Sequence, residues 1–145
     1  MRQDYSGCVP LKKKELTRRV HDVCAPFVEK GETLMQAAET LKGPKTSIAA
    51  LLTPIGFFLL ERPRHLALTN RRLLVVIPPA RVARGQPQLE AVWDRSDIEV
   101  ASFEPTRIWT RMVLRTPVGY LGFNFARVWR AEAEFLNRKL PPRRS

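Results

Sequence analysis

The chain has 145 residues, of which 44% are hydrophobic, and its 25 lysines and arginines outnumber 14 acidic residues to give a net charge of +11 at pH 7. This length is typical of one domain with its own core, and this hydrophobic content excludes a globally disordered chain. The charge favours an anionic partner, either nucleic acid or an acidic membrane surface, or else a basic surface that is only solvated. Cys8 and Cys24 belong to no CxxC or Cys/His pattern, so we expect free thiols in a reducing compartment.

The N-terminal region predicts a loose arm followed by an amphipathic helix. Residues 1–10 have no periodicity and no apolar stretch behind a basic start, so we expect no signal peptide. From Leu11 to Phe27 apolar residues recur every three or four positions, which is the pattern of one helical face. Pro26 cannot lie inside a helix, so this helix should end near Cys24. We expect it to cover the sheet of its own domain, with a membrane interface as the alternative.

A first strand is expected over Thr33–Leu41, between turns at 29–32 and 42–45. The next segment, Ile48–Leu60, carries no charge, but it is shorter than the roughly 20 residues of a membrane-spanning helix. Three interpretations remain for it: a buried core segment, a loop that enters lipid, or an oligomer interface. Phe57 and Phe58 are the candidate apolar contacts, and we expect the first helix, a second protomer or lipid to cover them.

A β-hairpin is expected over Arg64–Ile77, because two apolar runs flank the polar tetrad Thr69-Asn70-Arg71-Arg72. Asn70 suits the turn, since an Asn side chain can bond its own backbone. A basic, proline-containing loop follows over 78–88. Four more strands are then predicted: Leu89–Trp93, Ile98–Phe103, Arg111–Thr116 and Tyr120–Phe125.

The last predicted element is a helix over Ala126–Leu140, stopped by two prolines. Its apolar stripe consists of Trp129, Ala133, Leu136 and Leu140. We expect this stripe to pack the helix against the rest of the domain.

This order of elements resembles the bacterial PH-like and GRAM-type domains of the pleckstrin-homology-like superfold. The residues that carry the resemblance are Gly31-Glu32, Leu68-Thr69-Asn70-Arg71-Arg72-Leu73, Trp93-Asp94-Arg95-Ser96-Asp97-Ile98 and the strand Gly119–Phe125. The resemblance implies an α+β fold, a small curved antiparallel β-barrel or sandwich over residues 28–140 closed by the C-terminal helix. Residues 1–27 then form the arm and amphipathic helix, and 141–145 a disordered basic tail.

The resemblance also implies a binding site, because such domains often bind phosphoinositides or other anionic lipids through a basic strand–loop–strand, and others bind peptides. Lys45 followed by Arg62-Pro63-Arg64 approximates the lipid-binding pattern, in which arginine forks hold phosphate. Alternatively, Arg62 and Arg64 are solvated residues at a strand end. Arg71 and Arg72 are further candidates for the same role, or are structural residues of the hairpin.

Catalysis finds little support in the sequence. The histidines are His21, on the first helix, and His65, expected on a strand surface, and neither accompanies a nucleophile. Metal-ligand spacing and a Gly-rich phosphate loop are also missing, so we expect no enzyme, no metal and no cofactor. Nucleic-acid binding is a rival because several aromatic residues could stack on bases, although no nucleic-acid-binding motif occurs. These aromatic residues are Trp93, Trp109, Trp129 and Tyr120.

The sequence therefore predicts a cytoplasmic, non-catalytic binding module. Its expected partner is an anionic lipid at the inner membrane face or a protein, engaged through basic loops. Oligomerisation through residues 48–60 is the first alternative and nucleic-acid binding the second.

Overall fold

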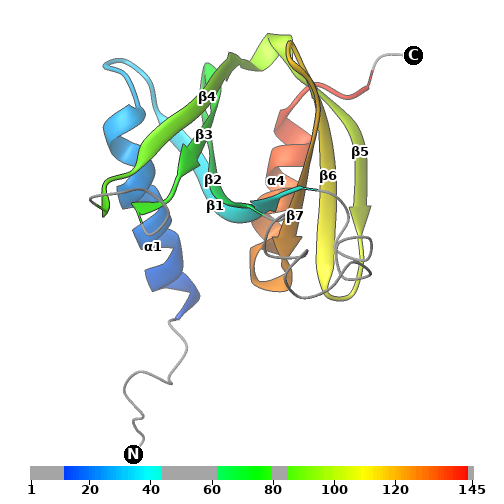
Figure 1. The fold of residues 1–145 in the computed structure, drawn as a ribbon, viewed down its shortest axis with the longest axis horizontal. Helices are drawn as coiled ribbons and strands as arrows, with labels where there is room; N and C mark the ends of the chain where they lie inside the picture. Colours follow the sequence, from blue (N-terminus) through cyan, green and yellow to red (C-terminus); the bar gives the residue numbers. More distant parts are fainter. Residues whose placement is uncertain (1–11, 44–61, 80–84, 144–145) are drawn as a thin grey trace, which may run out of the picture.

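The computed structural model describes residues 12–43, 62–79 and 85–143 (Figure 1). They form an α+β fold in which one antiparallel seven-stranded sheet has the order β4-β3-β2-β1-β7-β6-β5. The elements are α1 (Lys13–Cys24), β1 (Leu34–Lys42), β2 (Arg62–Thr69), β3 (Arg72–Ile77), β4 (Gln88–Asp94), β5 (Glu99–Pro105), β6 (Trp109–Thr116), β7 (Gly119–Ala126) and α4 (Arg130–Lys139), with short 3-10 turns at Ala25–Phe27, Arg95–Asp97 and Arg127–Trp129. The expected α+β class is confirmed. The sheet is not closed, because β4 and β5 are its two edges within the described residues.

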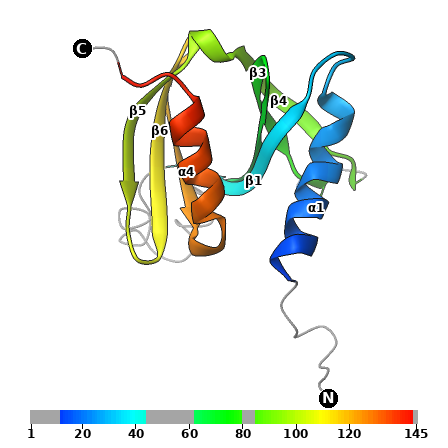
Figure 2. The ribbon, with the colours of Figure 1, turned by 180° about the vertical axis from the view of Figure 1, so that it is seen from behind.

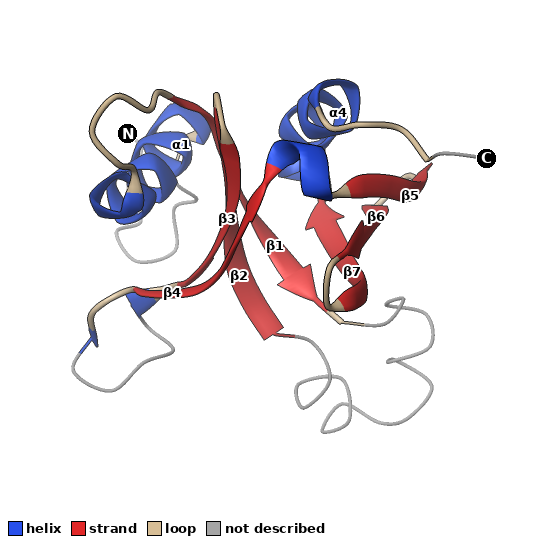
Figure 3. Ribbon diagram, turned by 90° about the horizontal axis from the view of Figure 1, so that it is seen from above, coloured by secondary structure: helices blue, strands red, loops and turns tan. Residues whose placement is uncertain are grey.

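The sheet divides at β1. This strand pairs with β2 along almost its whole length, from Leu34 opposite Thr69 to Lys42 opposite Arg62. Its pairing with β7 is limited to Leu41 opposite Asn124 and Lys42 opposite Phe123. The half formed by β1–β4 therefore diverges from the half formed by β5–β7, as the view from above shows (Figure 3).

Both helices lie on the same side of the strands, and each covers one half of the sheet (Figure 2). α1 packs on β1 and β2, and ends at Cys24 as predicted. Cys24 is a buried free thiol, and its burial raises its pKa to about 12. The sequence expectation that α1 covers the domain's own sheet is confirmed, since Val20 and Cys24 belong to the common core.

The C-terminal helix begins later than predicted, because Arg127–Trp129 forms a 3-10 turn ahead of α4. Its apolar stripe is buried as expected, with Trp129 only 3% exposed and Leu136 fully covered. Burial of each large side chain contributes roughly 2 kcal/mol. The two helices meet where Lys13 Nζ lies 3.0 Å from Glu132 Oε1 and 5.3 Å from the centre of the Trp129 ring.

The predicted hairpin is formed by β2 and β3, whose apolar runs Leu66–Leu68 and Leu73–Val76 are buried. Thr69 organises its turn: the Thr69 Oγ1 accepts hydrogen bonds from the amides of Arg71 and Arg72, at 3.1 and 2.8 Å. The Asn70 side chain does not have the role expected of it. Its Oδ1 accepts a hydrogen bond from the Thr33 amide at 2.9 Å, and so joins the hairpin to the chain just before β1.

The other predicted strands are present, with one departure from the expected alternation in β5. A bulge lies between Val100 and Ser102, and Ile98 precedes the strand. The bulge shifts the side-chain alternation after Val100. The three residues ahead of it, Ile98, Glu99 and Val100, are all buried. β5 is an edge strand, and the Pro141 carbonyl accepts a hydrogen bond from the Val100 amide at 2.8 Å. The first residues of the expected tail thus lie beside β5.

None of the helices described here is long and apolar enough to cross a membrane. The segment Ile48–Leu60, with Phe57 and Phe58, lies outside the described residues, as does Lys45.

Candidate functional site

The predicted basic residues fall into two groups at opposite ends of β2. Arg62 and Arg64 lie at its start, whereas Arg71 and Arg72 follow its end. A strand of eight residues separates them by roughly 20 Å. The fold therefore does not bring all the described candidates into one site.

Arg64 is held by an acidic partner from β4. Its Nε and Nη2 donate to the two carboxylate oxygens of Glu90, at 2.9 and 3.1 Å, and its Nη1 donates to the Pro63 carbonyl. Lys42 Nζ reaches the same carboxylate at 3.2 Å, and these two cations hold the pKa of Glu90 below its usual value. With a side chain only 9% exposed, Arg64 ties β2 to β4 rather than being solvated at a strand end.

Arg62 differs from Arg64, because its side chain is exposed and has no ion-pair partner in the part of the chain described. It lies opposite Lys42 in the β1–β2 register. We call Lys42, Arg62, Arg64 and Glu90 the basic hairpin end; three cations against one carboxylate give it a net charge of +2. Gly43 is held next to it, since Arg111 Nη1 donates to the Gly43 carbonyl at 3.0 Å.

The second group contains a buried ion pair. Arg72 Nη2 lies 2.6 Å from Glu32 Oε1, and Arg72 Nε donates to Glu32 Oε2 at 2.8 Å. The Glu32 carboxylate is fully covered and also accepts hydrogen bonds from the Thr69 hydroxyl and the Glu29 amide. Its hydrogen bond with Arg72 lowers the pKa of Glu32 to about 2, despite an opposing effect of burial. Arg72 is thus a structural residue that holds Glu32. The neighbouring Arg71 is exposed.

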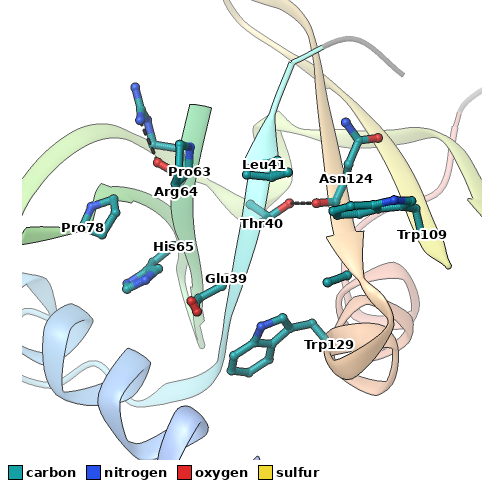
Figure 4. A pocket seen from close by; sticks show the side chains of 11 residues that line it. Glu39, Thr40, Leu41, Pro63, Arg64, His65, Pro78, Trp109, Asn124 and Trp129 are labelled. Atoms are coloured by element: carbon teal, nitrogen blue, oxygen red, sulfur yellow. Dashed lines mark hydrogen bonds between the residues drawn. The ribbon is translucent and has the colours of Figure 1, made fainter. Parts of the chain in front are cut away.

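A cavity of about 440 Å³ lies where β1 and β2 diverge from β7 (Figure 4). Its lining is mainly apolar and aromatic with a few polar groups, as in small-molecule sites. The lining residues are Glu39, Thr40, Leu41, Pro63, Arg64, His65, Pro78, Trp109, Asn124, Ala126 and Trp129.

Two polar residues of this cavity face each other across strands, since Glu39 and His65 are register partners of β1 and β2. His65 is only 8% exposed and its Nδ1 has no hydrogen-bond partner, so the expectation of a surface histidine is wrong. Its burial lowers its pKa to about 4, which leaves the ring neutral at neutral pH. Glu39 is half-buried, and burial raises its pKa.

Sequence reasoning missed the pairing of Glu39 with His65. The available signal was the presence of Glu39 and His65 beside apolar residues in strands that help to form the core. Their meeting depends on the register between β1 and β2, which no local pattern specifies.

The aromatic residues do not form one exposed stacking surface. Trp129 is buried and Trp93 and Trp109 are partly covered, whereas Tyr120 is 66% exposed. In the described ranges no cluster of His, Cys, Asp or Glu has the composition of a metal site. No family model and no curated protein matches the chain.

Proposed function

We propose that the chain is a PH-like, non-catalytic domain that docks on an anionic membrane through the basic hairpin end. The observation that carries the proposal is the pairing of Lys42 with Arg62. It brings together the two points at which the chain leaves and re-enters the described sheet. The connecting sequence, 44–61, contains the uncharged run Ile48–Leu60 between Lys45 and Glu61.

This arrangement combines the two components of peripheral membrane binding. An apolar segment contributes by burying its side chains in the lipid interface, and adjacent cations contribute by attraction to anionic head groups. Arg62 is the exposed cation of the described group, and Lys42 and Arg64 add a field that Glu90 only partly neutralises. The net charge of +11 acts in the same direction over a longer range.

The PH-like assignment is supported by the order of the elements. Antiparallel strands are followed by one helix, and Trp129 is buried just before that helix. The Gly31-Glu32 and Thr69–Arg72 segments, which carry the sequence resemblance, meet through the Glu32–Arg72 pair. A domain of this kind would act in the cytoplasm, peripherally at the inner face of the membrane.

Vesicle co-sedimentation tests the proposal. We expect binding to vesicles containing phosphatidylserine but not to pure phosphatidylcholine, with a loss as salt rises. The double variant Phe57→Ser, Phe58→Ser should weaken binding while its thermal unfolding midpoint is retained. Equal binding to both vesicle types, or no binding to either, would contradict the proposal.

The same double variant separates docking from the alternatives. A change in oligomeric state measured by light scattering, without an effect on vesicles, would assign the segment to a protomer contact. Loss of folding would assign it to the core. Tighter retention on DNA than on anionic vesicles at equal salt would favour nucleic-acid binding.

A further inference from the structure

We propose that the cavity between β1–β2 and β7 binds a small organic ammonium compound, whose charged nitrogen is held by Glu39 and whose apolar body packs between Trp109 and Trp129. This inference is independent of membrane docking. The cavity volume of about 440 Å³ lies within the range of roughly 300–1,000 Å³ that is common for small-molecule sites.

The polar groups of the cavity suit a cationic hydrogen-bond donor. Glu39 has no ion-pair partner in the described residues, although a half-buried carboxylate gains from one. His65 lines the same cavity, and because its imidazole is neutral it places no positive charge there. An ammonium group in the cavity would give the Glu39 carboxylate an ion-pair partner, and the neutral His65 ring beside it would not repel it.

Two cations near the cavity, Arg64 and Lys13, are already engaged. Arg64 contributes to the lining, but its guanidinium is bound by Glu90 and the Pro63 carbonyl. Lys13 lies over the Trp129 ring with its charge offset by Glu132. The unpaired charge that faces the cavity is therefore negative, in a chain whose overall charge is strongly positive.

The aromatic walls provide the second part of recognition. Trp109 begins β6 and Trp129 ends the 3-10 turn before α4, and Figure 4 shows both indoles bordering the space that Glu39 also borders. Indole faces attract organic cations and bury flat apolar groups. An amine with an aromatic body fits this combination better than an aliphatic acid.

On the other side, α1 provides one further charged group. Arg19 lines a neighbouring cavity of about 200 Å³ together with Glu39 and His65, and among the described residues no ion pair joins it to Glu39. The competing explanation is that Glu39 forms an ion pair with Arg19 in solution. In that case Arg19→Gln would destabilise the protein as much as Glu39→Gln, and amines would not bind.

The test uses phenethylammonium with two probes of similar body, the neutral phenethyl alcohol and the anionic hydrocinnamate. Binding is followed by isothermal calorimetry and by the indole N–H resonances in NMR spectra. We expect the amine to bind more tightly than either analogue and to shift the signals of Trp109 and Trp129 but not that of Trp93, which lies outside the cavity. Binding should weaken on acidification, as Glu39 becomes protonated.

The matched variants are Glu39→Gln and Glu134→Gln, which remove the same charge from the cavity and from the exposed surface of α4. We expect Glu39→Gln to weaken amine binding roughly tenfold or more, and Glu134→Gln to leave it unchanged. Equal affinity for the amine and the alcohol, or an unchanged affinity of Glu39→Gln, would overturn the proposal. So would indole signals that no probe shifts at millimolar concentration.

Discussion

Glu32→Gln is expected to lower the free energy of unfolding by about 2 kcal/mol. Arg72 holds the carboxylate through two charged hydrogen bonds, at 2.6 and 2.8 Å, and the pKa of Glu32 falls from 4.5 to about 2. At about 1.4 kcal/mol per pKa unit this shift corresponds to at most roughly 3 kcal/mol. We reduce this to about 2 kcal/mol because Arg72 retains some solvent contact, which screens the pair. In a domain of this size the thermal midpoint should fall by about 4–8 °C.

The same pair predicts a pH dependence with a definite sign. A carboxyl with a depressed folded-state pKa stabilises the protein above its unfolded pKa, and this stabilisation is lost as the pH falls through the folded value. The difference between parent and Glu32→Gln should therefore shrink from pH 4.5 down to about 2. Urea titrations at a series of pH values measure it.

Glu29→Gln is the matched control. The Glu29 side chain is 66% exposed and lies 3.9 Å from Arg72, so its removal should change stability by less than about 0.5 kcal/mol. The reasoning would be refuted if both variants lost the same free energy of unfolding. It would also be refuted if the loss in Glu32→Gln were as large at about pH 2 as at neutral pH.

Three further predictions concern stability and reactivity. Arg64→Gln should lower the free energy of unfolding by about 1–2 kcal/mol, because Glu90 then keeps only Lys42 as an ion-pair partner. Arg62→Gln should change it by less than about 0.5 kcal/mol. Equal urea midpoints for the two variants would contradict the assignment of Arg64 to a structural pair. Trp129→Ala should lower the free energy of unfolding by about 3–5 kcal/mol in the same urea assay. A decrease of less than about 1 kcal/mol would show that this side chain is not packed as described. Iodoacetamide should modify Cys24 only through unfolding, because its pKa of about 12 leaves little thiolate; mass spectrometry that finds it rapidly alkylated in the native protein would contradict its burial.

Much of the fold could be predicted because it follows from local patterns. The β2–β3 hairpin follows from two apolar runs around a polar tetrad, and the end of α1 from Pro26. The burial of Trp129 follows from its place on the apolar stripe of the last helix. These features depend on residues that are close in sequence, so periodicity and turn chemistry specify them.

The site could not be predicted in the same way, because its contacts are distant in sequence. Arg64 looks like a surface residue until β4 brings Glu90 to it, 26 positions later. Glu32 and Arg72 are 40 positions apart. The division of the sheet, which forms the cavity, depends on β1 pairing with β7 at only two positions. Register between distant strands is a property of the whole fold.

The structure gives different surroundings to the arginines that the resemblance to PH-like domains proposed as ligands. Arg72 was a candidate for lipid binding and proves to be part of a buried pair. Arg62 is the exposed member of its group and remains a predicted lipid ligand. The structure adds Lys42 and Glu90, which the sequence pattern does not contain.

The most direct test of membrane docking compares two charge reversals, Arg62→Glu and Arg71→Glu, in one vesicle assay. Both arginines are exposed, and they lie at opposite ends of β2. Each variant replaces one arginine by one glutamate, so the two variants have the same net charge. We predict that Arg62→Glu weakens binding to phosphatidylserine vesicles by at least about tenfold, since each cation at such a surface contributes about 1 kcal/mol and a reversal changes two charges. Arg71→Glu should have a much smaller effect. Equal losses of vesicle affinity would show that binding depends only on the net charge of the protein. A greater loss for Arg71→Glu would contradict docking through the basic hairpin end.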